Sequence, residues 1–160
     1  QSRSSAASDV YKRQNFNWNS FVHKDFELSN LIHLQNREDH LKCGILDFQN
    51  AFIGFSGWDI FSLLENPRIY FDDKYNDELI EYFYNNTNQN ISFNEFFIQY
   101  YFLNTARQSR VIGRWINLDK KNKNNYYSKY LDVTINRLKK SLYYLQNSKL
   151  SKLYSKVIGE

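Results

Sequence analysis

Two short apolar runs separated by a polar segment constrain the fold of this chain most strongly. The runs are NLIHL (30–34) and CGILDF (43–48), and the segment between them is QNREDHLK. Apolar runs of this length on either side of a polar turn are typical of the two strands of a β-hairpin. The sequence therefore predicts an antiparallel hairpin with a long loop, preceded by another short strand over residues 20–23.

After this hairpin the sequence pattern changes to a helical one. The segment AFIGFSG (51–57) is interpreted as a loop, because it contains two glycines and little periodicity. A short helix is expected to begin near Trp58 and to stop at Pro67, since proline disfavours helical backbone at the preceding residue. Apolar positions on one side of the chain then predict a helix over residues 73–85.

The C-terminal half is predicted to be helical throughout. Ser92 and Glu95 have the spacing of a capping box, and they open a long helix that is expected to reach about Asn117. Leucines and an isoleucine at alternating spacings of four and three predict a further helix over residues 131–145. The fold class is therefore α+β, with a small β-hairpin followed by a mostly helical half.

The composition is that of a single globular domain. The chain has 160 residues, of which 42% are apolar and 18% aromatic, so it can bury a core and is too apolar for a disordered polymer. Its single cysteine excludes an internal disulfide and suits a reducing compartment. No apolar run reaches the ~18 residues of a membrane span, and no signal peptide is visible. We expect a cytoplasmic protein without a membrane partner.

Residues 1–14 differ in composition from the rest of the chain. The stretch QSRSSAASDVYKRQ is rich in Ser and Ala and lacks the bias toward Asn, Phe and Tyr that starts at Asn15, and the chain contains no methionine. We interpret it as a non-native or disordered leader and place the folded domain in residues 15–160. The leader supplies half of the net charge of +4, and the other half is too small to indicate a nucleic-acid partner.

Polar side chains are predicted to meet at the open end of the hairpin. If Leu34 and Cys43 flank the loop, Asn30 pairs near Asp47, about 5 Å away across the ladder. Their amide and carboxylate oxygens are the hard ligands that Mg²⁺ prefers, with water and phosphates in the remaining positions. Asp25 leads into the same end of the hairpin and can accept a proton from an attacking hydroxyl. Together these residues predict metal-assisted phosphoryl transfer.

The residues around these positions carry a family resemblance. HKDFELSN (23–30) followed by ILDFQ (45–49) resembles the catalytic and metal loops of the aminoglycoside phosphotransferase/choline-kinase-like family, which are small-molecule relatives of the protein kinases. DFQNAFIGFSGWDIFSLL (47–64) and TARQSRVIGRWINL (105–118) are similar to the branch of N-acetylmuramate/N-acetylglucosamine kinases. The resemblance covers about residues 20–145.

The resemblance implies a fold, a reaction and cofactors. The fold is the mostly helical C-lobe of a protein-kinase-like transferase, whose N-lobe is missing from this chain and would act in cis. The reaction is transfer of phosphate from ATP, with Mg²⁺, to a hydroxyl of a sugar or amino sugar. Because the sequence contains neither a Gly-rich phosphate loop nor a strand of the V-A-I-K type, we expect the chain alone to be inactive.

The resemblance also implies individual roles. They are Asp25 as catalytic base, His23 as a brace of its loop, Asn30 and Asp47 as Mg²⁺ ligands, Ile32 under the adenine ring, and Asp59 as an anchor of the catalytic-loop backbone.

Three arginines are predicted to share one face of the long helix, because Arg107, Arg110 and Arg114 are spaced by three and four. They form either a solvated stripe or, as the resemblance implies, contacts to an anionic group of the substrate or to phosphate. Trp115 and the segment FFIQYYF (96–102) are interpreted as core.

The remaining histidines and the cysteine are interpreted as residues without a catalytic or binding role. His33 and His40 are expected to be structural or solvated. Cys43 begins a predicted strand and is interpreted as a core residue rather than a nucleophile.

Two other classes of function remain open. A metal-dependent hydrolase would use His23, Asp25, His33 and Asp47 as ligands, and stoichiometric Zn²⁺ or Mn²⁺ binding without nucleotide would favour it. A non-enzymatic RNA-binding module would use the arginine face and the tyrosines, and its binding would fall steeply with salt.

Overall fold

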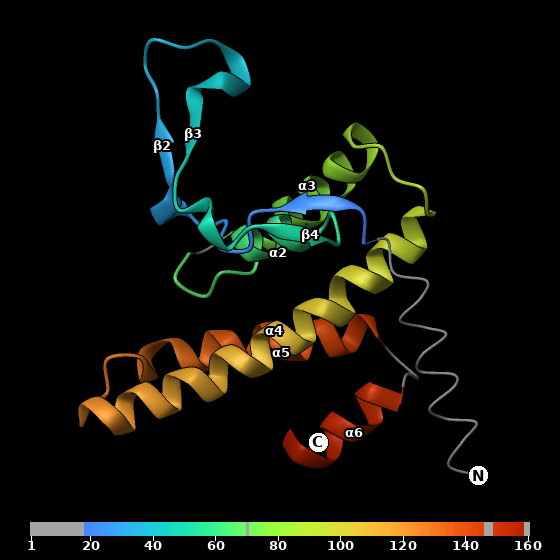
Figure 1. The fold of residues 1–160 in the computed structure, drawn as a ribbon. Coiled ribbons are helices and arrows are strands. Elements are labelled where there is room, and N and C mark those ends of the chain that lie inside the picture. Colours follow the sequence, from blue (N-terminus) through green and yellow to red (C-terminus); the bar gives the residue numbers. More distant parts are fainter. Residues whose placement is uncertain (1–17, 70, 146–148, 159–160) are drawn as a thin grey trace. The chain divides into compact units, whose positions relative to one another are not determined.

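The structure, a computed structural model, describes residues 18–69, 71–145 and 149–158 (Figure 1). The predicted leader, residues 1–14, lies outside the described residues. The chain divides into two compact units, Gln1–Asp59 and Ile60–Glu160. The described strands all belong to the first unit and the long helices to the second (Figure 1). The fold class is α+β, as predicted from the sequence.

The first unit contains two separate two-stranded antiparallel sheets. Strand β1 (Ser20–Val22) pairs with β4 (Phe52–Gly54), and β2 (Leu31–His33) pairs with β3 (Cys43–Ile45). The predicted hairpin is therefore present, together with the strand before it. The assignment of 51–57 to a loop is wrong for β4, because a three-residue strand ending in glycine carries no readable periodicity and its partner lies far away in the sequence.

The register of the β2–β3 hairpin differs by one residue from the predicted one. Leu31 pairs with Ile45, and the Leu34 N–H donates to the Lys42 carbonyl at 2.7 Å. Asn30 consequently faces Leu46, whose N–H donates to the Asn30 carbonyl at 2.9 Å. The expected pairing of Asn30 with Asp47 is wrong in register, because the loop closes one residue earlier than the apolar pattern indicated.

The second unit is built from helices. They are α2 (Trp58–Leu64), whose first two residues still belong to the first unit, α3 (Asp73–Asn86), α4 (Phe93–Asn122), α5 (Leu131–Tyr144) and α6 (Lys149–Ile158). Four of these were predicted, and α6 was not. No helix in the described segments is both long and apolar enough to cross a bilayer.

Helix α4 begins at the predicted capping box. Ser92 Oγ accepts from the Glu95 N–H at 3.3 Å, and Glu95 Oε2 accepts from the Ser92 N–H at 2.9 Å, so both residues satisfy donors at the helix start. The helix continues to Asn122, five residues beyond the predicted end at Asn117, and the chain then turns at Lys123 with a φ of 51°.

The core of the second unit is aromatic. Tyr100 and Tyr101 of α4 are fully buried, and the Tyr101 ring stacks on Tyr144 of α5 with centroids 4.4 Å apart. Phe61 of α2 meets Tyr100 edge to face at 5.6 Å. The assignment of Trp115 and FFIQYYF to the core is confirmed for Trp115 and most of the run, and it is wrong for Ile98 and Phe102, which are 46% and 41% exposed.

Candidate functional site

The loop that follows β1 is anchored by a carboxylate from the first turn of α2. Asp59 Oδ2 accepts from the backbone N–H of His23 at 2.7 Å, and Oδ1 accepts from that of Lys24 at 2.9 Å. Lys24 has a φ of 80°, which is uncommon for a residue with a Cβ. The two hydrogen bonds therefore hold the loop entrance in a conformation that the backbone does not favour by itself.

The same carboxyl group has a perturbed ionisation. Partial burial raises the pKa of Asp59 above its ordinary value, while the amide hydrogen bonds from His23 and Lys24 and the nearby His23 ring act in the opposite direction. A raised pKa means that the folded state favours the protonated acid relative to the unfolded chain. Asp59 is thus a group whose cost of burial is only partly offset by its contacts.

His23 joins this loop to the segment before Asp47. The residue is 3% exposed, and its Nε2 lies 2.7 Å from the Leu46 carbonyl oxygen. A carbonyl can only accept, so Nε2 carries the proton in this arrangement. Within the described part of the chain, Nδ1 is buried and has no hydrogen-bond partner. The imidazole therefore ties the two loops together through one of its nitrogens.

Asn30 closes the loop that carries Asp25. Its Nδ2 donates to the Asp25 backbone carbonyl at 2.8 Å, and its own N–H donates to the Glu27 carbonyl at 2.8 Å. With Nδ2 used inside the loop, Oδ1 is the side-chain atom available as an acceptor or metal ligand. Asp25 itself is exposed, so its carboxylate is accessible to a substrate.

Asp47 leaves the line of β3 through its backbone conformation. It has φ 65° and ψ 42° in the left-handed region and precedes a 3-10 turn, Phe48–Asn50. Its carboxylate accepts a hydrogen bond from Gln49 Nε2, and the residue is exposed. Asp47 is therefore positioned by a turn, rather than by the β2–β3 ladder in which it was predicted.

The structure brings some predicted site residues together and separates others. His23, Asp25, Asn30 and Asp59 are linked through one loop, and Asp47 is connected to that loop through its neighbour Leu46. Ile32 lies on β2 opposite Gly44 and is 42% exposed.

The three arginines belong to the second unit and differ in their surroundings. Arg107 is half-buried and its Nη2 donates to the Ser62 carbonyl at 3.5 Å, whereas Arg110 and Arg114 are exposed. His33 and His40, which were expected to be structural or solvated, are exposed. Cys43 is exposed as well, so its assignment to the core is wrong.

The side-chain oxygens of Asn30 and Asp47 are better suited to Mg²⁺ than to a metal ion that is coordinated only by protein side chains. In the described segments, no group of three or more His, Cys, Asp or Glu side chains is placed to hold a metal ion. The set proposed for a hydrolase, with His33 and Asp47 among its members, is not gathered there. Mg²⁺ needs only one or two protein ligands beside water and phosphates, so Asn30 Oδ1 and the Asp47 carboxylate fit it chemically.

Sequence reasoning missed contacts that pass through the backbone. Leu46 contributes its carbonyl to His23, and Lys24 contributes its N–H to Asp59 and its carbonyl to Trp58 Nε1 at 3.4 Å. A backbone group has no side-chain signature, so the motifs that contain Lys24 and Leu46 gave no sign of these contacts.

The comparison with known proteins gives a partial similarity. No protein-family model matches the chain. A segment of 48 residues, 30% of this chain, is 40% identical to an N-acetylmuramate/N-acetylglucosamine kinase of Caulobacter vibrioides. The aligned segment spans 13% of that kinase. Over this segment, the chain is similar to an amino-sugar kinase.

Proposed function

We propose that this chain carries the catalytic and metal-binding loops of an ATP-dependent phosphotransferase. The observation that carries the proposal is the anchored loop of residues 23–30, in which Asp59 fixes the backbone and Asn30 closes the loop around an exposed Asp25. The similarity to an amino-sugar kinase supports the same class of reaction. The acceptor in this proposal is a hydroxyl of a sugar or amino sugar.

The roles follow from the chemistry of each group. A bound Mg²⁺ would neutralise charge on the phosphate oxygens of ATP, the phosphoryl donor. Asn30 Oδ1 and the Asp47 carboxylate would hold the cation, and Asp25 would accept the proton of the acceptor hydroxyl as the hydroxyl oxygen attacks phosphorus and ADP leaves. Asp59 and His23 act through the backbone and keep Asp25 in place.

The proposal also includes an assignment of the fold. We assign the chain to the C-lobe of a protein-kinase-like fold, and the nucleotide-binding lobe would act in cis. The assignment is supported by the segments HKDFELSN (23–30) and ILDFQ (45–49), which resemble the catalytic and metal loops of that fold. The arginine face of α4 remains a candidate contact for an anionic substrate group.

The test separates the two aspartates in the whole kinase. Asp25→Ala should lower turnover by about 10²–10⁴-fold, the loss typical of one general base, while the affinity for Mg²⁺-ATP stays within a few-fold. Asp47→Ala should weaken Mg²⁺-dependent nucleotide binding as well as turnover. Calorimetric titration with Mg²⁺-ATP and a coupled ADP-release assay with amino sugars measure both quantities.

Glu38→Ala is the matched control, because Glu38 is another exposed carboxylate of the same unit without a role in the proposal. It should change neither quantity. Loss of nucleotide binding in Asp25→Ala together with normal binding and turnover in Asp47→Ala would refute the assignment.

A further inference from the structure

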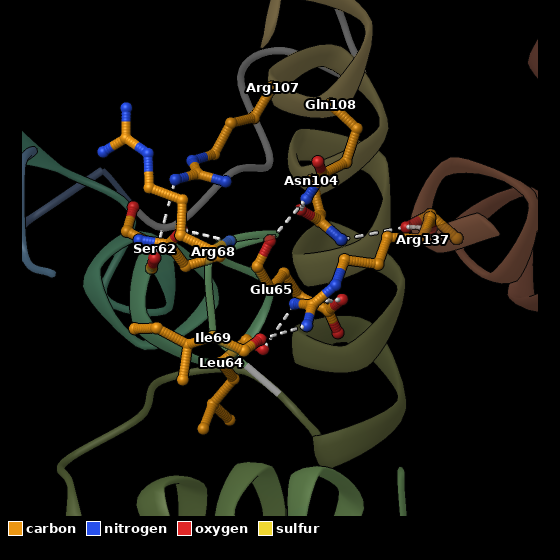
Figure 2. A network of polar contacts seen from close by, with 11 residues as sticks. Ser62, Leu64, Glu65, Arg68, Ile69, Asn104, Arg107, Gln108 and Arg137 are labelled. Atoms are coloured by element: carbon orange, nitrogen blue, oxygen red, sulfur yellow. Dashed lines mark hydrogen bonds and ion pairs between the residues drawn. The ribbon is translucent and has the colours of Figure 1, made fainter. Parts of the chain in front are cut away.

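A half-buried arginine binds the last residue of α2 and the segment that follows it (Figure 2). Arg137 of α5 donates from Nη1 to the Leu64 carbonyl at 2.7 Å and from Nη2 to the Ile69 carbonyl at 2.8 Å. Its Nη1 also lies 3.6 Å from Glu65 Oε2, in a salt bridge whose side chains are 11% and 1% exposed. One guanidinium thus binds two backbone carbonyls and neutralises a buried carboxylate.

Two residues of α4 complete the network from another direction (Figure 2). Gln108 Nε2 donates to the Glu65 carbonyl at 3.0 Å, and Arg107 Nη2 donates to the Ser62 carbonyl at 3.5 Å. The last carbonyls of a helix have no partner within the helix. Here side chains of α4 and α5 take that place, so the end of α2 is fixed from outside the helix.

Helix α2 depends on such external contacts because it is short. It has seven residues, and isolated helices of this length are not stable in water. Its first turn carries Asp59, which holds the amides of His23 and Lys24. Asp59 anchors the candidate catalytic loop, and Leu64 provides the carbonyl that Arg137 binds. The two residues therefore lie less than two turns apart on the same helix.

We propose that Arg137 is a positioning residue for the Asp25 loop and acts on it through α2. The guanidinium holds the last residue of α2 through the Leu64 carbonyl and the following segment through the Ile69 carbonyl. The helix in turn positions Asp59, and Asp59 holds the loop entrance. A lysine would keep the charge next to Glu65 but cannot bind two carbonyls in the fixed geometry of a guanidinium. The catalytic consequence rests on the proposed function, whereas the structural consequence does not.

Amide hydrogen exchange, followed by NMR on the full chain without ligands, tests the proposal. In Arg137→Lys, the amides of His23 and Lys24 should exchange about tenfold faster, the effect of losing one hydrogen bond of ordinary net strength. The amides of Tyr100 and Tyr101, in the middle of α4, should keep their protection. Asp59→Asn, which alters the anchor directly, should accelerate the same two loop amides.

Thr134→Val is the matched control. Thr134 is a buried residue of the same helix, and its Oγ1 donates to the Tyr130 carbonyl at 2.6 Å, so the change removes a buried hydrogen bond of α5 without touching a carbonyl of α2. It should leave the exchange of His23 and Lys24 unchanged. If Arg137→Lys fails to fold, Gln108→Leu removes the contact to the Glu65 carbonyl and carries the same expectation.

Two outcomes would overturn the proposal. One is unchanged exchange at His23 and Lys24 in Arg137→Lys, which would mean that charge alone suffices. The other is equal acceleration of all amides, which would show a contribution to global stability only. In the whole kinase, Arg137→Lys should lower kcat and leave the KM for ATP unchanged. If the unmodified kinase has no such activity while the exchange result holds, the proposed function fails and the positioning role stands.

Discussion

At the scale of single residues, the backbone conformation of Asp47 and its chemistry are matched. Asp and Asn are the residues that adopt left-handed backbone most readily after glycine, and Asp47 has a φ of 65°. The turn takes its carboxylate out of the β2–β3 ladder, where it would have faced a neighbouring strand. An aspartate at this position therefore suits the turn and is also compatible with the metal-ligand role that we propose for Asp47.

This match allows the charge to be removed without changing the turn. Asp47→Asn should keep the backbone conformation and weaken binding of Mn²⁺, which serves as a paramagnetic substitute for Mg²⁺. The measurement is the broadening of the Asn30 side-chain and Gln49 amide signals in NMR spectra of the chain on titration with Mn²⁺. Glu38→Gln should not alter the broadening. Equal broadening in Asp47→Asn and in the unmodified chain would exclude Asp47 as a ligand.

Asp119 of α4 gives a pH-dependent contribution to stability. Its carboxylate accepts from the Tyr127 N–H at 3.0 Å and from Ser128 Oγ at 2.7 Å. Desolvation acts to raise the pKa of Asp119, but these hydrogen bonds together hold it below its ordinary value. Between the lowered value and the ordinary one, the unfolded chain binds more protons than the folded chain. The free energy of unfolding therefore falls as the pH drops through this window.

Asp119→Asn should remove that part of the acid sensitivity. Urea denaturation at pH 7 and near pH 3 measures it, and the difference in unfolding free energy between the two pH values should be smaller in the variant. Asp132→Asn is the control, because Asp132 is an exposed aspartate of α5. An unchanged difference in Asp119→Asn would show that these hydrogen bonds do not favour the ionised form.

At the scale of elements, the long helices were predictable because their signals are local. The capping box at Ser92 and the apolar stripe of α5 each lie within one segment, and both helices begin within a residue or so of the predicted positions. The end of α4 was not predictable from local pattern. Its last turn contains Asp119, which contacts Tyr127 and Ser128 in the segment after the helix, so tertiary contacts extend it past Asn117.

The candidate site was predictable in its residue types but not in its register. The spacing of Asp25, Asn30 and Asp47 is visible in the sequence, and so is the acidic residue at position 59 through the family resemblance. The pairing of β2 with β3 was wrong by one residue, because apolar runs do not fix which residue closes the loop. The left-handed turn at Asp47 was also not predictable, since Asp occupies many other conformations.

The capping box of α4 makes a measurable contribution to stability. Ser92→Ala removes the acceptor for the Glu95 N–H, and loss of such a cap costs about 0.5–2 kcal/mol of stability. Ser92→Asp keeps an oxygen acceptor at the same place and should retain most of the stability. Thermal unfolding followed by circular dichroism distinguishes the variants, and an unchanged midpoint in Ser92→Ala would show that solvent replaces the cap at no cost.

At the scale of the whole molecule, the first unit exposes large apolar side chains. Phe21 of β1 and Ile53 of β4 are a cross-strand pair and are 67% and 64% exposed. Leu41 and Phe48 of the same unit are exposed as well. Neighbouring exposed apolar side chains such as Phe21 and Ile53 promote association, and the small net charge of +4 opposes it only weakly.

The chain should therefore self-associate at high concentration, and replacing the pair should reduce this. The double variant Phe21→Thr, Ile53→Thr keeps strand-forming residues and should shift sedimentation velocity profiles toward the monomer. Tyr82→Thr, which removes a similarly exposed aromatic of α3, is the control and should have a smaller effect. A chain that is monomeric at all concentrations would contradict the expectation.

The order of the strands has a consequence for folding. Strands β2 and β3 lie between β1 and β4 in the sequence, so one antiparallel pair is nested inside the other. Closing a loop costs conformational entropy that grows with its length. Once β2 and β3 have paired, the loop that β1 and β4 must close is effectively shorter. We therefore expect the inner pair to form first and the outer pair after it, so that Asp25 and Asp47 reach their positions only in the later step.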